Sequence, residues 1–525
     1  MKVLIPEPIG QQCIDVLKSE GFEVTYQPTM THDELKHAIG EYDALVVRSA
    51  TKVTADILTH AANMKVIGRA GTGVDNIDIE ASTRRGIIVL NVPGGNTVST
   101  AEHTISLLMA LARNIPQAHQ SVKEGKWDRK KYVGVELCGK TIGVIGLGKV
   151  GREVAKRCRG FEMNVIAFDP VLAPEVASKV GIEIVDLDLL LRRSDFITVH
   201  TPLTNETRNL IDVRALAMCK KGVRIINCAR GGIVNEQALL DALNANIVAG
   251  AALDVFEKEP PGNQPLVMHP NVVVTPHLGA STEDAQEKVA VDIAHQIAAV
   301  LKAKDIIGSV NADTLRQSMN AGNQPYLQLA EKMGSLVVQL MQGKMYTLRI
   351  QTSGSLLEEM SGAVSSAVLK GMFSKILDEP VNYLNAPMIA RERGLNVQTS
   401  REGEHELYNQ LLTVSYETDK EKRSFAGTVF GNNNPRIVAI DGFRFEIKPE
   451  GHLLIYYNLD KPGMLAAVGA ILAAAEVNIA GVSLGRFEQG KQALTIMNMD
   501  SEVPPTILRQ LSGIDGVTGV KMVTL

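Results

Sequence analysis

A glycine-rich segment near residue 150 has the residue types and spacing that suit a dinucleotide. It reads Gly146-Leu147-Gly148-Lys149-Val150-Gly151 and lies between an apolar run and a helical pattern. The first glycine permits a tight turn, the second lets the backbone approach a pyrophosphate, and the third lets the helix pack on the strand. The amino end of the helix then offers N–H groups to the phosphates. The segment therefore predicts a dinucleotide site.

Asp169 favours NAD over NADP at this site. It ends the next apolar run, 18 residues after Gly151. A carboxylate at this position can accept hydrogen bonds from the ribose hydroxyls, and it repels the additional phosphate of NADP. The alternative interpretation is a cluster of turn glycines beside an unrelated surface aspartate.

Three side chains with complementary chemistry follow three later apolar runs. They are Arg230, Glu259 and His277. Hydride transfer from a secondary alcohol needs a base for the hydroxyl proton, a cation for the substrate carboxylate and a group that orients the base. An imidazole, a guanidinium and a carboxylate meet these needs. Open α/β sheets bind ligands beyond the carboxyl ends of their strands, so we expect the three side chains to converge there.

Several other residues compete with this interpretation. His200 also follows an apolar run and is an alternative base, whereas His103 lies within a helical pattern and is interpreted as packing or as a domain contact. Cys228 is an alternative nucleophile, although a packing role is favoured. Each member of the trio, taken alone, could equally be a surface residue.

The strands and helices that position these residues are indicated by an alternation of short apolar runs with helical patterns. It predicts two parallel α/β units, the first over about ninety residues and the second from Lys140. A single long helix is expected over 99–124, and a further helix over 282–302 that returns to the first unit. The strands expected in the second unit span 141–145, 164–168, 196–199, 223–227, 250–255 and 272–275.

The last two hundred residues have a different pattern of expected helices and strands. Residues 312–447 combine a helix (326–341) and a strand (346–351) with irregular polar stretches such as Gly431-Asn432-Asn433-Asn434-Pro435. Residues 450–525 have the order βαββαβ, which predicts a ferredoxin-like unit.

Composition excludes several classes of protein. The chain has 525 residues, 45% of them hydrophobic and 21% charged, with a net charge of -4. These values give no basic footprint for nucleic acid or for a membrane surface, and no apolar run reaches the ~18 residues of a membrane span. The five cysteines are scattered without a CxxC pair, so neither a disulfide framework nor a metal site is expected. We expect a cytoplasmic protein.

Four segments together resemble the D-isomer-specific 2-hydroxyacid dehydrogenases. They are Gly146–Gly151, Asn227–Gly232, the stretch from Asp254-Val255-Phe256 to Glu259-Pro260, and Pro276-His277-Leu278-Gly279. The resemblance covers about the first 310 residues. It implies that Arg230 binds and polarises the substrate, Glu259 supports the histidine and His277 exchanges the proton.

The resemblance also implies further contacts. Arg48-Ser49-Ala50-Thr51 and the segment from Arg69 to Asn76 are similar to the branch of the family that acts on 3-phosphoglycerate, at the start of serine biosynthesis. It implies that Arg48, Ser49, Gly71, Arg230 and His277 face the substrate. The cofactor-contacting positions it implies are Gly146, Gly148, Lys149, Val150, Gly151, Asp169, Thr72, Thr201, Cys228, Asp254 and Gly279.

The C-terminal unit resembles an ACT domain, a regulatory module that binds amino acids. Asn458, Asp460 and Asn478 occupy the positions implied to hold an effector, which in this family is L-serine. The alternative is a module that serves only for pairing of subunits. The family assembles at least as dimers, and a homotetramer is expected here.

These inferences combine into one expected organisation. A discontinuous flavodoxin-like substrate domain (1–95 and 282–310) encloses a Rossmann NAD-binding domain (96–281). An α+β intervening domain (312–447) and a ferredoxin-like ACT domain (450–525) follow. Two other functions stay open, namely a glyoxylate or hydroxypyruvate reductase and a dinucleotide-sensing interaction protein on the same fold.

Overall fold

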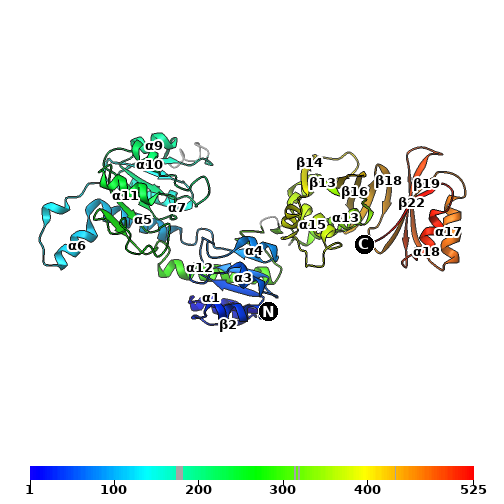
Figure 1. Ribbon diagram of the computed structural model, residues 1–525, viewed down its shortest axis with the longest axis horizontal. Coiled ribbons are helices and arrows are strands. Elements are labelled where there is room, and N and C mark those ends of the chain that lie inside the picture. The colour runs from blue at the N-terminus through cyan, green and yellow to red at the C-terminus, as the bar shows by residue number, and fades with distance from the viewer. Residues whose placement is uncertain (173–180, 313–314, 317, 319, 432) are drawn as a thin grey trace.

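The computed structural model describes residues 1–172, 181–312, 315–316, 318, 320–431 and 433–525. Its strands form four sheets, and Figure 1 shows the first sheet (blue) between the second (cyan to green) and the two C-terminal sheets (yellow to red). This α/β architecture with a ferredoxin-like C-terminal unit confirms the expected fold class.

The first sheet is parallel and has the strand order β2-β1-β3-β4-β5. This is the flavodoxin-like order. Its elements are β1 (Lys2–Ile5), α1 (Gln11–Ser19), β2 (Glu23–Tyr26), α2 (His32–Ala38), β3 (Ala44–Val47), α3 (Ala55–Thr59), β4 (Val66–Arg69), α4 (Ile79–Arg84) and β5 (Ile88–Leu90).

A helix from much later in the chain completes this first unit. α12 (Glu283–Leu301) packs against α1 and β4, and its apolar residues share one core with β1 and β3. Gly68 in β4 allows this approach, because a Cβ there would lie 2.5 Å from Cδ1 of Ile297. The chain therefore leaves the first unit and returns to it.

The second sheet is also parallel, with the order β12-β11-β10-β9-β6-β7-β8. β6 lies between β7 and β9, so the strand order reverses at its carboxyl end, where such sheets bind ligands. Seven strands are present instead of the six expected, because the short β8 extends one edge. The elements are β6 (Thr141–Ile145), α7 (Lys149–Gly160), β7 (Asn164–Phe168), β8 (Glu183–Ile184), α9 (Leu187–Arg193), β9 (Phe196–Val199), α10 (Val213–Met218), β10 (Val223–Asn227), α11 (Glu236–Asn244), β11 (Val248–Leu253) and β12 (Val272–Val274).

The single helix expected over 99–124 is wrong. The structure has two helices, α5 (Thr97–Arg113) and α6 (Ile115–Lys123), separated at Asn114. Asn114 has a left-handed backbone with φ of 53°, and Pro116 lies in the first turn of α6. Proline cannot continue the preceding helix, so the chain changes direction here. α5 packs on the second sheet, whereas α6 stands away from it (Figure 1).

The region 312–447 is more regular than its sequence suggests. It forms a six-stranded sheet with the order β14-β13-β15-β16-β17-β18. The polar stretch that begins at Gly431 lies between two paired strands, with Phe430 opposite Asn434; Asn432 itself lies outside the described residues. The elements are α13 (Gln324–Leu340), β13 (Met345–Ser353), α14 (Ser355–Glu359), α15 (Ser361–Phe373), α16 (Ala386–Glu392), β14 (Asn396–Arg401), β15 (Leu411–Thr418), β16 (Lys422–Phe430), β17 (Asn434–Ile440) and β18 (Phe443–Ile447).

The C-terminal unit has the expected βαββαβ order and an antiparallel sheet β20-β21-β19-β22. One face of this sheet, including Leu453, Ile455 and Leu494, shares a single core with α13 and α15. The last two units are therefore packed together. The elements are β19 (His452–Leu459), α17 (Met464–Ala474), β20 (Ile479–Arg486), β21 (Gln492–Met499), α18 (Pro505–Ser512) and β22 (Val517–Thr524).

Among the described residues, no helix is both long and apolar enough to cross a membrane.

Candidate active site

Three neighbouring parallel strands bring the candidate trio to one edge of the second sheet. The last residues of β10 and β11 are paired, and β12 ends beside β11. Arg230, Glu259 and His277 each follow one of these strands within a short loop. Their convergence follows from the parallel pairing, which places all three carboxyl ends together.

His277 and Glu259 form a close pair. Nδ1 of His277 lies 2.8 Å from Oε2 of Glu259, and the second oxygen of Glu259 accepts a hydrogen bond from the N–H of Phe256 at 3.1 Å. The carboxylate accepts a hydrogen bond from Nδ1–H, so Nε2 is the nitrogen that can exchange a proton with a ligand. His277 also has a left-handed backbone with φ of 56°, which is rare for a residue with a side chain.

Arg230 reaches from its loop to the first unit. Its Nε lies 3.3 Å from Oδ2 of Asp75, and its Nη1 donates to the carbonyl of Ala229. A side chain at Gly73 would collide with this guanidinium. Asn227 supports the loop, because its amide group donates to the carbonyl of Arg230. The guanidinium therefore lies between the two units.

Two further arginines lie near Arg230. Arg69 donates through Nε to the carbonyl of Arg48 at 3.1 Å. Burial lowers the pKa of Arg69, and the neighbouring charges of Arg230 and Arg48 lower it further. The three guanidinium groups are close enough to interact electrostatically, so this region suits an anion with more than one negative charge.

Glu7 holds the loop that contains Arg48 and is a residue that the sequence analysis missed. It is 5% exposed, and its carboxylate accepts the N–H groups of Arg48, Ala50 and Thr51 at 2.7, 3.1 and 3.1 Å. The detectable signal is an acidic residue two positions after the end of the first strand. Ser49 is exposed on this loop, and the N–H of Gly71 donates to the carbonyl of Arg69.

The glycine segment connects β6 to α7 as expected. Gly146 has a φ of 90°, and a Cβ at Gly151 would collide with the Gly146 carbonyl oxygen. Gly148 precedes α7 without a side-chain cap, so the first N–H groups of the helix are open to an anion. Val150 is partly buried, whereas Lys149 donates to the carbonyl of Pro93.

Asp169 lies at the carboxyl end of β7 beside the glycine loop. Its Oδ2 accepts the N–H of Leu147 at 2.8 Å, and its Oδ1 accepts the N–H groups of Val171 and Leu172. A carboxylate has further acceptor capacity for a ribose. The buried hydroxyl of Thr201 has no hydrogen-bond partner among the described residues, so it suits a polar group of a bound molecule. These features fit a dinucleotide.

Of the remaining candidate cofactor positions, Thr72 is partly buried, and Cys228, Asp254 and Gly279 are buried. Thr72 bonds to Asn96 at 2.7 Å, in the segment that joins the two units. Cys228 is buried, and burial raises the pKa of its thiol to about 12, so it is not a nucleophile at neutral pH. Asp254 is 1% exposed and accepts the N–H groups of Leu278 and Gly279. It therefore holds the turn that contains His277.

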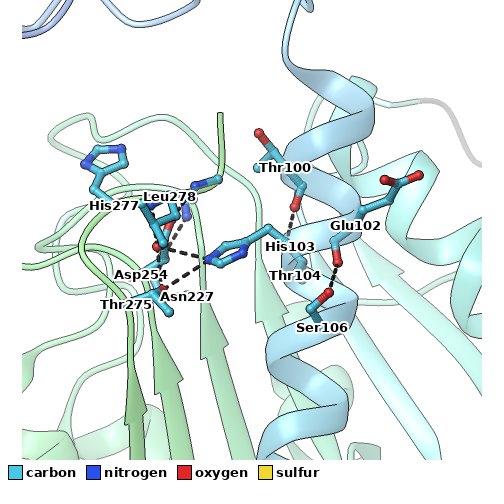
Figure 2. A network of polar contacts seen from close by, with 12 residues as sticks. Thr100, Glu102, His103, Thr104, Ser106, Asn227, Asp254, Thr275, His277 and Leu278 are labelled. Carbon is cyan, nitrogen blue, oxygen red and sulfur yellow. Dashed lines mark hydrogen bonds and ion pairs between the residues drawn. The ribbon is translucent and has the colours of Figure 1, made fainter. Parts of the chain in front are cut away.

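The competing base His200 is unsuited to that role. Its Nε2 lies 2.9 Å from Oγ1 of Thr198, and burial lowers its pKa to about 4. His103, interpreted from the sequence as a packing or domain-contact residue, instead contacts Asp254 and Thr275 (Figure 2). No group of three or more potential metal ligands occurs in the part of the chain that the structure describes.

The three candidate effector residues are engaged separately. Asn458 is buried and accepts the hydroxyl of Thr495 at 2.8 Å. Asp460 binds Arg486 at 2.7 Å, and Asn478 donates to Asp500 at 2.6 Å. A hollow of about 410 Å³ lies beside Asn458, lined also by Leu459, Gln492, Gly516 and Thr518.

Comparisons with known proteins agree along the whole chain. Residues 105–279 match "D-isomer specific 2-hydroxyacid dehydrogenase, NAD binding domain", residues 323–441 match "D-3-phosphoglycerate dehydrogenase intervening domain", and residues 452–516 match "ACT domain". The D-3-phosphoglycerate dehydrogenase of Archaeoglobus fulgidus is 45% identical over 528 residues, which covers 100% of both chains.

Solved structures resemble more than half of the chain. The TT0316 protein from Thermus thermophilus is 32% identical with a TM-score of 0.55, and the match covers 59% of this chain and 100% of that one. A glyoxylate reductase from Paecilomyes thermophila is 29% identical with the same TM-score, and covers 59% of this chain and 98% of its own.

Proposed function

This chain belongs to the D-isomer-specific 2-hydroxyacid dehydrogenase family, in its phosphoglycerate dehydrogenase branch, and we propose that it oxidises 3-phospho-D-glycerate to 3-phosphohydroxypyruvate with NAD, the first step of L-serine biosynthesis. The observation that supports this most directly is the His277–Glu259 pair at 2.8 Å, on the strand edge from which Arg230 extends. A proton acceptor and a carboxylate-binding cation are what oxidation of a 2-hydroxy acid needs.

Each member of the trio has a distinct task in this proposal. Arg230 binds the substrate carboxylate and polarises the hydroxyl-bearing carbon. Nε2 of His277 accepts the hydroxyl proton, and Glu259 keeps the imidazole oriented by accepting the hydrogen bond from Nδ1. NAD, when bound, supplies the acceptor for the hydride that leaves the same carbon.

The cofactor-binding part of the proposal involves the glycine segment and the loops beside it. The open N–H groups of α7 face the pyrophosphate, and Asp169 accepts the ribose hydroxyls. Thr201 has a free hydroxyl for the cofactor. We place Lys149, Val150, Thr72, Cys228, Asp254 and Gly279 as residues that shape this site.

The arginines of the first unit support 3-phosphoglycerate as the substrate. This molecule has a phosphate as well as a carboxylate, so it presents more negative charge than glycerate or lactate. Arg48 and Arg69 lie near Arg230 and offer additional cations, and Ser49 and Gly71 belong to the same loops.

Regulation by L-serine is proposed for the ACT domain, with Asn458, Asp460 and Asn478 as the contacts.

The domain boundaries proposed are 1–95 with 282–310, 96–281, 312–447 and 450–525. We also propose a homo-oligomer, a tetramer, in the cytoplasm; all five cysteines are free thiols, which suits a reducing compartment.

The alternative of a glyoxylate or hydroxypyruvate reductase has less support. The glyoxylate reductase structure aligns with 59% of this chain and leaves the rest of it without a counterpart. A dinucleotide-sensing protein, the other alternative, would have the same fold and bind the dinucleotide without catalysing a reaction.

A substrate panel tests the proposal. Wild-type protein should reduce NAD with 3-phosphoglycerate and much less with glycerate or lactate, and NADP should be a poor substitute. His277→Asn should lower kcat by roughly 10²- to 10⁴-fold, the contribution of a general base, while NAD binding measured by fluorescence is retained. Preferred turnover of glyoxylate or hydroxypyruvate would contradict the substrate assignment, and wild-type NAD binding without turnover would favour the sensor.

A further inference from the structure

Asp254 is a buried carboxylate that gathers donors from two separate segments. It is 1% exposed at the carboxyl end of β11. Its Oδ1 accepts the hydroxyl of Thr275 at 2.6 Å and the N–H of Leu278 at 2.7 Å, and its Oδ2 accepts the N–H of Gly279 at 2.8 Å. All three of these donors belong to the turn that contains His277.

The second segment is helix α5, which contributes His103. Nε2 of His103 lies 3.1 Å from Oδ1 of Asp254 and 3.1 Å from Oγ1 of Thr275. Figure 2 shows the ring reaching from α5 to the strand ends, with His277 projecting from the other side of the turn. His103 is 151 residues from Asp254 in the sequence.

Geometry determines the direction of these hydrogen bonds. The only proton of the Thr275 hydroxyl is directed to Asp254 at 2.6 Å, and an ionised carboxylate can only accept. Nε2 of His103 must therefore carry a proton and act as the donor. Burial alone would raise the pKa of Asp254, but the hydrogen bonds from His103 and Thr275 outweigh burial and hold it below its ordinary value.

The turn needs such support because its backbone is unusual. His277 has a φ of 56°, a conformation that persists in a residue with a side chain only where neighbouring contacts enforce it. Asp254 bonds to the backbone on the C-terminal side of His277 and to the side chain of Thr275 on its N-terminal side. The position of the imidazole thus depends on the position of Asp254.

We propose that His103 is a positioning residue for the dehydrogenation: by donating to Asp254 and Thr275 it fixes the turn of residues 275–279 and thereby the imidazole of His277. This inference rests on the proposed function, and it adds a residue from a helix that lies outside the three catalytic loops. His103 does not exchange the substrate proton in this arrangement, since its Nε2 is directed to protein groups.

The test compares two substitutions at this position. His103→Gln keeps an N–H donor at a similar reach, whereas His103→Leu removes the donor and leaves Asp254 with the donors of the 275–279 turn alone. His103→Leu should lower kcat with 3-phosphoglycerate by about 10²-fold, the cost of misplacing a reacting group by about 1 Å. The KM values for NAD and substrate should change by less than about threefold, and His103→Gln should recover most of kcat.

Ser106→Ala is the matched control on the same helix. Its hydroxyl donates to the Glu102 carbonyl, one turn back, on an exposed face (Figure 2). This variant should have the kcat of the wild type. Equal losses of kcat in His103→Gln and His103→Leu, or a wild-type kcat in His103→Leu, would overturn the proposal.

Hydrogen exchange gives a readout that does not need turnover. The amide N–H groups of Leu278 and Gly279 should exchange at least about tenfold faster in His103→Leu than in the wild type, and not in His103→Gln. Unchanged exchange in His103→Leu would contradict the positioning role even if the wild type oxidised no 2-hydroxy acid, an outcome that would count against the proposed function alone.

A second variant covers the case in which His103→Leu does not fold. Thr275→Val preserves the side-chain shape and removes the hydroxyl that donates to the same oxygen of Asp254. It should also lower kcat with little change in KM. A wild-type kcat in Thr275→Val would show that fixing this carboxylate has no effect on the reaction.

Discussion

At the scale of single residues, two carboxylates near the same strand edge have different surroundings and therefore different tasks. Glu259 is partly exposed and binds the imidazole of His277, so its task is to orient that ring. Asp254 is buried and bonds mainly to backbone and helix groups, so it serves to hold the turn. Their chemistry is identical, and burial with the choice of donors distinguishes them.

Arg230→Lys tests the cation at this scale. Lysine keeps the charge but loses the planar pair of donors that matches a carboxylate, so kcat/KM for 3-phosphoglycerate should fall by roughly 10- to 100-fold. The loss is measured in steady-state assays, with Arg214→Lys on the exposed face of α10 as the control. Equal kcat/KM in the two variants would show that the guanidinium of Arg230 does not bind the substrate.

At the scale of elements, parallel strands position the site and their ends differ in exposure. β9 is followed directly by a histidine whose burial lowers its pKa, whereas β12 leads to a histidine that is about half exposed. Both follow apolar strands, so the sequence alone left both histidines as candidates for the base. The neighbouring loops decide which imidazole can meet a substrate.

The burial of His200 makes the stability of the fold depend on pH. Burial lowers its pKa from 6.5 to about 4, so between these values the unfolded chain binds a proton that the folded protein does not. Its contribution to stability is complete above pH ~6.5 and is lost as the pH falls toward ~4, by ~2 kcal/mol between pH 7 and pH 5. Calorimetry should show a smaller decrease in Tm over this interval for His200→Gln than for the wild type.

The control for this experiment is His119→Gln, an exposed histidine on α6. It should have the same pH sensitivity as the wild type. A decrease in Tm for His200→Gln as large as that of the wild type would contradict the buried titration.

At the scale of the whole molecule, the C-terminal units are coupled by packing and by polar contacts. They share one apolar core. Tyr457 in β19 donates to Asp441 at 2.9 Å, and Arg423 in β16 bonds to both at 2.9 Å. α16 is linked in turn to the first unit through Glu392 and Arg84 at 2.5 Å. A ligand of the last unit therefore has a continuous path of contacts to the first unit.

Titration calorimetry of L-serine into the full chain tests regulation at this scale. Wild-type protein should bind serine and lose activity, and Asp460→Asn should bind it at least ~10-fold more weakly, because a charged hydrogen bond to the ligand is lost. Asp515→Asn, at a carboxylate that is 97% exposed in the same unit, is the control and should bind normally. Absence of binding heat for the wild type would remove serine as the effector.

Local patterns in the sequence determined a large part of this protein. Strand and helix alternation, the glycine segment and the βαββαβ order depend on neighbouring residues, so they could be predicted without the tertiary structure. The trio at the strand ends was also predictable, because parallel pairing brings the ends of successive strands together. The break at Asn114 was missed although Pro116 signals it in the sequence.

Only the tertiary structure decided which distant groups meet. Glu7 holds a loop more than forty residues away, His103 reaches Asp254 across 151 residues, and Leu453 shares a core with α13. Such contacts depend on how the sheets and helices pack, and no local periodicity encodes them. A histidine in a helix and a histidine in a loop look alike in sequence, and their burial and partners give them different chemistry.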